Sequence, residues 1–184
     1  MRKQWALLAG TVMIILSGCG NSNAPVQEHT TSSQQHDTSD MNHSTSSKLP
    51  AGLKEAENPA FKVGSQAIIR ADHMAGMNGA AATIVGAYTT TAYTVSYTPT
   101  TGGEKVTNHK WVIHEEIKDA GSEPYTPGTE VILAADHMKG MDGAKATIDS
   151  AEPTTVYMVD YTPTTGGTPV KNHKWVTESE LSAK

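Results

Sequence analysis

Histidine and methionine occur together at fixed spacings in two separate parts of the chain. The first set begins at His73, and the same set returns 64 residues later. Imidazole and thioether groups are borderline to soft ligands, and two methionines in one set favour copper, Cu(I) above all, over zinc or calcium. The candidate metal ligands are His73, Met74, Met77, His109, His137, Met138, Met141 and His173.

The spacing within each set allows its ligands to converge on one ion. Met77 lies four residues after His73 and three after Met74, so one helical turn of the loop would bring either pair together. His73 and Met74 are large, polarizable side chains on a glycine-rich loop that we expect to be exposed, where they have no evident packing role. Whether the two sets bind separately or share one ion stays open at this point.

Tryptophan accompanies the last histidine of each set. Trp111 follows His109 by two residues, which on a strand predicts the same face, and Trp175 follows His173 in the same way. An indole beside a bound cation would shield it from solvent. For Met77 and Trp111, however, packing in a core is the favoured alternative, because most such apolar side chains serve that role.

The N-terminus has the layout of a secretory signal. Two basic residues precede an apolar run over 5–16, which is too short to span a bilayer. The run ends in Leu16-Ser17-Gly18-Cys19, which resembles the lipobox of bacterial lipoproteins. The resemblance implies that residues 1–18 are a signal peptide, that Cys19 carries a lipid, and that the protein is anchored at the outer face of the bacterial cell membrane.

A polar segment over 19–60 follows. Its part from 21 to 48 contains 11 Ser and Thr and no aromatic residue, which predicts a disordered stalk. Histidine-rich tracts can collect metal, although random polar sequence explains these residues equally well. The weaker, auxiliary candidates for metal binding are His29, His36, Met41 and His43.

The remainder is one unit written twice. Residues 61–117 and 125–181 align without a gap, and 32 of the 57 positions are identical. A repeat of this length is able to fold alone, though marginally. Residues 118–124 are then a linker between two domains.

Each repeat has the periodicity of strands. In the first copy we expect strands over 66–71, 80–87, 92–97 and 106–113, and a short helical turn near 115–117. Several short strands in fewer than about 60 residues predict a small closed barrel, which also removes sheet edges. The expected fold class is all-β, with two tandem small barrels after the stalk.

The glycines and apolar residues over 128–148 resemble a KOW motif in an SH3-like barrel. The whole arrangement, with its two His-Met-x-Gly-Met and Asn-His-Lys-Trp-Val motifs, is similar to the YdhK/CopL-type lipoproteins of Gram-positive bacteria. Members of that family are linked to copper tolerance, which the resemblance implies for this chain. The partners we expect are the membrane, the metal ion, and a copper exporter or oxidase.

Other function classes fit the sequence less well. The net charge of −5 and the export signal argue against nucleic-acid binding, and the single cysteine excludes an internal disulfide framework. No serine or cysteine is placed beside a base as a hydrolase requires, so we expect no enzyme. The main alternative is an SH3-like module that binds cell wall or protein without metal and uses exposed tyrosines such as Tyr88.

Overall fold

The computed structural model describes residues 46–184, which contain β-strands and two 3-10 turns but no α-helix. The prediction of an all-β protein is confirmed. No helix that could cross a membrane is found in this part of the chain. The elements are β1 Lys54–Glu55, β2 Gln66–Ile69, β3 Ala81–Tyr97, β4 Val106–Ile113, η1 His114–Glu116, β5 Glu130–Ile132, β6 Lys145–Tyr161, β7 Val170–Thr177, η2 Glu178–Glu180 and β8 Leu181–Ala183.

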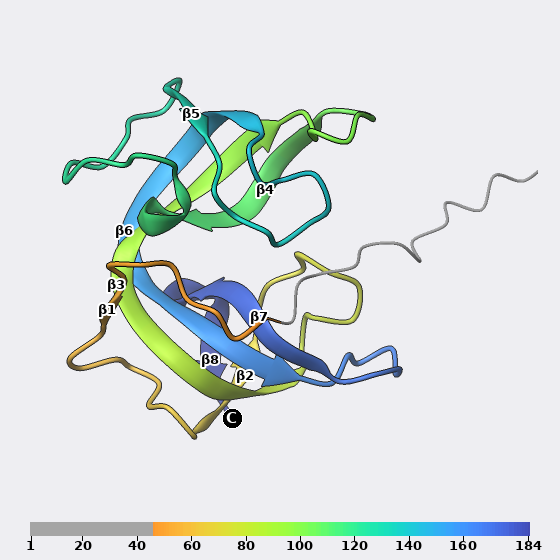
Figure 1. Cartoon of the computed structure of the whole chain (residues 1–184). Coiled ribbons are helices and arrows are strands. Elements are labelled where there is room, and N and C mark those ends of the chain that lie inside the picture. Colours follow the sequence, from red (N-terminus) through yellow and green to blue (C-terminus); the bar gives the residue numbers. More distant parts are fainter. Residues whose placement is uncertain (1–45) are drawn as a thin grey trace, which may run out of the picture. The chain divides into compact units, whose positions relative to one another are not determined.

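A ribbon of two long strands connects the two repeats (Figure 1). β3 and β6 have 17 residues each and pair antiparallel, from Ala82 opposite Tyr161 at one end to Tyr97 opposite Ala146 at the other. Because the strands are antiparallel, the beginning of β3 lies beside the end of β6. The beginning of β6 in turn lies beside the end of β3.

Each end of this ribbon is completed by strands of both repeats. At one end the order is β8-β2-β3-β6-β7, with β2 from repeat 1 and β7 and β8 from repeat 2. At the other end β5 pairs with the beginning of β6, β4 pairs with the end of β3, and Ile117 bridges to Leu133. We call these ends lobe 1 (residues 61–87 and 156–184) and lobe 2 (residues 92–151).

The two hydrophobic cores mix the repeats in the same way. The core of lobe 1 contains Ile69, Met77 and Ile84 from repeat 1 together with Tyr157 and Val159 from repeat 2. The core of lobe 2 joins Tyr93, Val95, Tyr97 and Val112 of repeat 1 to Val131, Leu133, Met141 and Ile148 of repeat 2. The prediction that residues 61–117 and 125–181 are separate barrels is therefore wrong, since each repeat supplies part of two cores.

The exchange has a local cause in β3. We expected strands over 80–87 and 92–97 with a break between them, but the strand continues without one. The intervening residues include Thr89, Thr90 and Thr91, whose β-branched side chains favour an extended backbone, and the segment 88–91 contains no Gly, Pro, Asn or Asp to turn the chain. They pair with residues 153–155 of β6 instead. The extended segment therefore carries the second half of each repeat into the other lobe.

The strand pairings within residues 46–184 do not close a barrel. Within residues 46–184, β7 pairs with β6 and β8 pairs with β2, while no pairing joins β7 to β8. The pairings of lobe 1 thus form an open path that bends around its core. The expected all-β class holds, whereas the expected closed ring is not seen in these hydrogen bonds.

The predicted stalk ends earlier than residue 60. β1 pairs with β3 at Lys54–Thr89 and Glu55–Tyr88, and Leu53, Ala56 and Phe61 pack against the cores. The Lys174 ammonium donates a hydrogen bond to the carbonyl oxygen of Lys48 at 2.6 Å. The apolar residues from Leu53 onward explain the difference, because they give this segment a surface to bury that the serine-rich part lacks.

Candidate functional site

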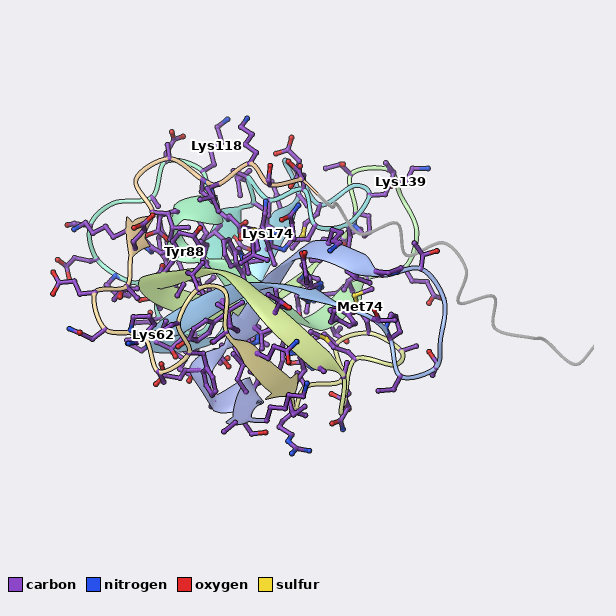
Figure 2. All side chains as sticks on the ribbon, turned by 90° about the horizontal axis from the view of Figure 1, so that it is seen from below. Lys62, Met74, Tyr88, Lys118, Lys139 and Lys174 are labelled. Atoms are coloured by element: carbon purple, nitrogen blue, oxygen red, sulfur yellow. The ribbon has the colours of Figure 1, made fainter. Side chains whose placement is uncertain are left out.

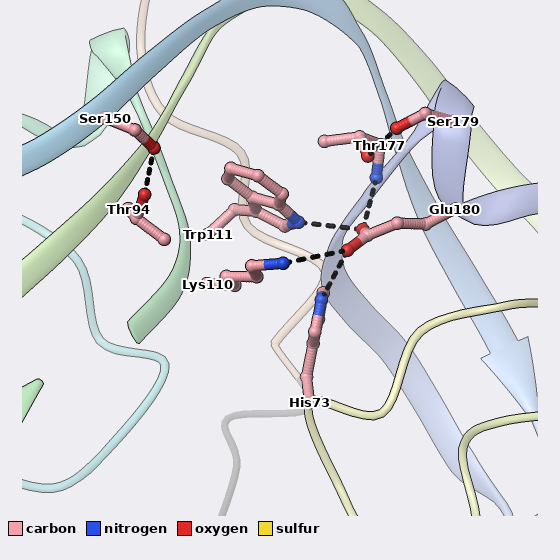
Figure 3. A network of polar contacts seen from close by, with 8 residues as sticks. All are labelled: His73, Thr94, Lys110, Trp111, Ser150, Thr177, Ser179 and Glu180. Atoms are coloured by element: carbon pink, nitrogen blue, oxygen red, sulfur yellow. Dashed lines mark hydrogen bonds and ion pairs between the residues drawn. The ribbon is translucent and has the colours of Figure 1, made fainter. Parts of the chain in front are cut away.

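A carboxylate of η2 gathers donors from both repeats, as Figure 3 shows. Oε1 of Glu180 lies 2.8 Å from Nε2 of His73, and the Lys110 ammonium lies 3.9 Å from the same oxygen. Oε2 accepts hydrogen bonds from the Trp111 indole at 2.8 Å and from the backbone N–H of Thr177 at 3.1 Å. Glu180 thus fixes a histidine and a tryptophan that both belong to the other repeat.

The same arrangement recurs around Glu116 of η1. Its Oε1 lies 2.7 Å from Nε2 of His137, and its Oε2 accepts from the Trp175 indole at 3.0 Å. The backbone N–H of Ile113 donates to that oxygen at 3.2 Å. The side chains of His137 and Glu116 are each only 4% exposed, against 8% and 13% for His73 and Glu180. The expectation of exposed histidines on an open loop is wrong, because each ring turns inward to its carboxylate.

The carboxylates determine which ring nitrogen is left for a ligand. A carboxylate only accepts hydrogen bonds, so Nε2 of His73 and of His137 is the donor, and in the neutral form of each ring Nδ1 keeps its lone pair. Both Nδ1 atoms are buried and have no hydrogen-bond partner within residues 46–184. A histidine held by a carboxylate through one nitrogen, with the other nitrogen left over, is the usual arrangement of a metal-binding imidazole.

The protonation of Glu180 follows from the same contacts. Burial by itself would raise the pKa of this carboxyl group. The hydrogen bond from His73, the charge of that ring when it is protonated, and further hydrogen bonds from Thr177 and Trp111 outweigh burial and hold the pKa below its ordinary value. Glu180 is therefore ionised at neutral pH and keeps its acceptor role toward the histidine.

The four histidines of the two predicted sets line one cavity of ≈ 340 Å³. His109 Nε2 and His173 Nε2 are buried, as are the Nδ1 atoms of the other two rings. The ring centres of His109 and His137 lie 6.3 Å apart. The other lining residues are Asp72, Val106, Thr107, Asn108, Lys110, Met138 and Lys174. The structure thus brings the histidines of both sets together and places His109 beside a histidine of the other repeat, not beside His73.

Met74 and Met138 have matching surroundings in the two lobes. The Tyr161 hydroxyl donates to Sδ of Met74 at 3.5 Å, and Tyr97 donates to Sδ of Met138 at 3.8 Å. Burial raises the pKa of both tyrosines, which keeps these hydroxyls protonated as donors. The edge of each tyrosine ring meets a histidine of the predicted sets, His173 at 5.8 Å and His109 at 5.9 Å between ring centres. Figure 2 marks Met74, which is partly buried against the core of lobe 1.

Met77 and Met141 lie elsewhere. Both are 0% exposed and belong to the cores of lobe 1 and lobe 2 respectively. Their backbone N–H groups close the turns that begin at Met74 and Met138, each at 3.1 Å. Neither methionine lines the cavity. The packing alternative is correct for the position of Met77, and of the four predicted methionines only Met138 lines the cavity.

Trp111 does not share a face with His109. The register of β3 and β4 shifts between Tyr93 opposite Val112 and Val95 opposite His109, which inserts an extra residue into β4. A β-bulge of this kind interrupts the alternation of side chains. His109 consequently lies with Tyr97 and His137 in lobe 2, while Trp111 reaches Glu180 and lies edge-on to His73, 6.3 Å away between ring centres. Trp111 and Trp175 are buried together in a third apolar cluster between the two cores.

The loops that carry the histidines are held by turns of the other repeat. The carbonyl oxygen of Gly76 accepts a hydrogen bond from the backbone N–H of Thr164 at 2.8 Å, and that of Gly140 accepts from Thr100 at 2.9 Å. At Gly76 the backbone φ is +74°, and an added Cβ would lie 2.5 Å from Oγ1 of Thr165. The twice-written Thr-Pro-Thr-Thr-Gly-Gly segment therefore positions the twice-written His-Met loop.

The sequence analysis missed Glu116 and Glu180. They are identical at the repeat offset and each follows its tryptophan by five residues, which was the available signal.

Among residues 46–184, no three His, Cys, Asp or Glu side chains form a group that could hold a metal ion. A site here would accordingly need the methionine sulfurs. Cys19 and the candidates His29, His36, Met41 and His43 lie outside the described residues.

Tyr88, on which the wall- or protein-binding alternative relied, is not on the surface. It is 7% exposed and packs edge-on against Trp175, with 5.8 Å between ring centres. Figure 2 marks its position on β3. Because Tyr88 is buried in the third apolar cluster, it is not the exposed aromatic residue that this alternative required.

Fold and site together define a class of all-β protein in which a tandem repeat is intertwined around a cavity rich in histidine. The family model described as "Protein of unknown function (DUF1541)" matches residues 63–114 and 127–178, which are the two repeats. The chain belongs to the DUF1541 family.

Solved relatives confirm the resemblance to YdhK. The uncharacterized protein YdhK of Bacillus subtilis (strain 168) is 60% identical over 179 residues, which cover 97% of this chain and 87% of that protein. A crystal structure of YdhK, a DUF1541 family protein, matches with a TM-score of 0.76 and 68% identity, over 79% of this chain and 99% of that one. A solution NMR structure of the YdhK C-terminal domain matches with a TM-score of 0.64 and 71% identity, over 67% of this chain and 94% of that one.

Proposed function

We propose that this protein binds Cu(I) outside the cytoplasm and sequesters it without catalysing a reaction. The observation that carries the proposal is the pair of inward-facing histidines, His73 and His137, each fixed through Nε2 by a glutamate and each left with a buried, unbonded Nδ1. Burying a polar nitrogen without a partner is unfavourable. A cation bound at each nitrogen would satisfy it.

The donors favour a soft monovalent ion. Imidazole nitrogen and thioether sulfur are both neutral, and Met138 lines the cavity together with the four histidines. Lys110 and Lys174 line it as well, which makes the site less favourable for a divalent cation than for Cu(I). Glu116 and Glu180 would act from behind the ligands, by orienting the rings and raising their basicity.

The proposed location is the outer face of the bacterial cell membrane, with the lipid on Cys19 as anchor. Support comes from the lipobox and from the fact that Cys19 is the only cysteine. Cys19→Ser should release the protein into the medium or leave it unprocessed, as fractionation would show. A free, unmodified thiol at Cys19 in the mass spectrum of the wild-type protein would contradict the anchor. A copper exporter or oxidase remains the partner that we propose for metal transfer.

Anaerobic Cu(I) titration against a competing chelator tests metal binding. His73→Gln and His137→Gln remove Nδ1 but keep an N–H that can still reach the glutamate, and Met74→Leu and Met138→Leu remove sulfur at nearly constant volume. We expect the quadruple variant to lose more than about a hundredfold in affinity, beyond what changes in outer-shell residues give. Trp111 and Trp175 fluorescence should fall on Cu(I) addition to the wild type.

The matched control is the pair Met77→Leu and Met141→Leu, which removes two sulfurs from the cores instead of the site. Copper binding should be unchanged in this control as long as it is folded. If the quadruple variant binds Cu(I) as tightly as the wild type, the assignment of these loops is wrong. The histidines of the stalk then become the better candidates, and removal of residues 20–45 would abolish binding.

A further inference from the structure

We infer that copper binds at two sites and that each site is built across the repeats. Each would take one histidine from a loop of one repeat and one histidine from a strand of the other. This inference rests on the proposed function and adds to it the ligand pairing and the coordination geometry. The sequence groups His109 with His73, in the same repeat. In the structure His109 instead faces His137, and the two ring centres lie 6.3 Å apart.

This separation fits one ion held between two imidazoles. A metal–imidazole bond measures about 2.0–2.1 Å and the ring centre lies roughly 1 Å behind its nitrogen, so rings on opposite sides of one ion have centres about 6 Å apart. Glu116 occupies Nε2 of His137 and leaves its Nδ1, and this atom and Nε2 of His109 are both buried. A site of two imidazoles and a thioether suits the soft ion Cu(I) better than Zn(II), which takes four ligands in structural sites.

A third ligand is at hand in the same lobe. Met138 follows His137 in the loop, lines the same cavity, and receives a hydrogen bond from Tyr97, whose ring edge meets His109. Tyr97 therefore touches both the thioether and the imidazole that would hold the ion. The site of lobe 2 is His109, His137 and Met138.

The repeat supplies the counterpart in lobe 1. His73 is fixed by Glu180 as His137 is by Glu116, and Tyr161 contacts both Met74 and His173 as Tyr97 contacts Met138 and His109. His73 and His173 line the same cavity as the first pair. The site of lobe 1 is His73, His173 and Met74, so that two ions would occupy positions lined by one cavity.

Cross-repeat pairing is tested by two double variants that each remove two histidines. His109→Asn with His137→Gln empties one site and leaves the other whole, whereas His73→Gln with His109→Asn removes one imidazole from each site. Asn keeps a polar group at the position of Nδ1 and loses Nε2, and Gln does the reverse. Both are made in the full chain, purified in detergent, with His29→Ser, His36→Ser, Met41→Ser and His43→Ser as a common background that removes the auxiliary ligands.

The readouts are Cu(I) stoichiometry against a competing chelator and the copper X-ray absorption spectrum, with circular dichroism to verify folding. We expect two tightly bound ions in the background chain, one in His109→Asn/His137→Gln, and none in His73→Gln/His109→Asn. The spectrum should fit two nitrogens and one sulfur per copper. The reverse order of the two variants would overturn cross-repeat pairing and restore sites within repeats, while copper binding itself would stand.

Two other results would also overturn the inference. One tightly bound ion in the background chain, lost in both variants, would mean that the four histidines share a single site. No tightly bound ion in the background chain would refute the proposed function itself for these residues. If a variant loses binding and its circular dichroism has also changed, the loss could come from unfolding, and Tyr97→Phe then supplies the test. This variant keeps the ring and all four histidines and should weaken only the site of lobe 2.

Discussion

At the scale of single residues, the two glutamates that hold the loop histidines, Glu116 and Glu180, matter most. Each accepts hydrogen bonds from a histidine, an indole and a backbone N–H. Glu116→Gln or Glu180→Gln would present an amide N–H₂ to one of these donors and leave a buried group unpaired, which destabilises by about 1–3 kcal/mol. Urea unfolding should show this loss for both variants. The exposed Glu123 is the control, and Glu123→Gln should change stability by no more than about 0.5 kcal/mol.

A second prediction at this scale concerns Tyr157 and alkaline pH. Burial, followed by the hydrogen bond to Glu178, raises the pKa of Tyr157 to about 12. The unfolded chain, with a phenol pKa of about 10, releases this proton more readily than the folded chain. The contribution of Tyr157 to the unfolding free energy is therefore complete below about pH 10, and it is lost as the pH rises from about 10 toward 12. In Tyr157→Phe, the unfolding free energy should fall less steeply over this window; equal slopes would contradict the assignment.

At the scale of elements, the close contact between the His-Met loop and the opposite turn is testable at Gly140. Its φ is +78°, and an added Cβ would lie 2.6 Å from Oγ1 of Thr101 and 3.1 Å from Cβ of Pro99. Gly140→Ala therefore combines backbone strain with a clash. Gly128 has a φ of +87° but nothing within 4 Å of the added Cβ, so Gly128→Ala shows the strain alone, about 1 kcal/mol.

We expect Gly140→Ala to lower the unfolding free energy by at least about 1 kcal/mol more than Gly128→Ala does. Thermal unfolding of the two variants gives the comparison. Because the loop carries His137 and Met138, Cu(I) affinity should fall in Gly140→Ala and stay constant in Gly128→Ala. Equal stabilities would show that the turn yields to the methyl group and does not hold the loop.

At the scale of the whole molecule, one repeat should not fold as a monomer. Residues 118–184 contain the second part of lobe 2 (118–151) and the second part of lobe 1 (156–184), so each core lacks the strands that repeat 1 supplies. Far-UV circular dichroism of this fragment should show little β structure at low concentration. Two copies could supply both parts of one lobe, so β structure should increase with protein concentration as a dimer forms. A folded monomer of 118–184 would contradict the intertwined fold, and residues 46–184 serve as the control.

The sequence by itself determined the class of fold and singled out the four histidines that line the cavity. Strand periodicity predicted β4 over 106–113 as it is observed, and the alternation of Tyr93, Val95 and Tyr97 correctly placed these side chains in a core. These features are local, since each depends on residue types a few positions apart. The repeat likewise identified both His-Met loops and both strand histidines before any contact was known.

Only the tertiary structure decided which histidines lie together. The two repeats are identical at 32 of 57 positions. Their sequences are therefore compatible both with repeats that fold on themselves and with repeats that exchange strands, because every contact within a repeat has an equivalent contact between repeats. At Thr89–Thr91 the strand continues instead of turning, which is compatible with the exchange but does not by itself impose it. The exchange places His109 beside His137, and it brings Glu180 to a histidine 107 residues earlier in the chain. Long-range pairing of this kind depends on the free energy of the whole sheet, which no short stretch of sequence records.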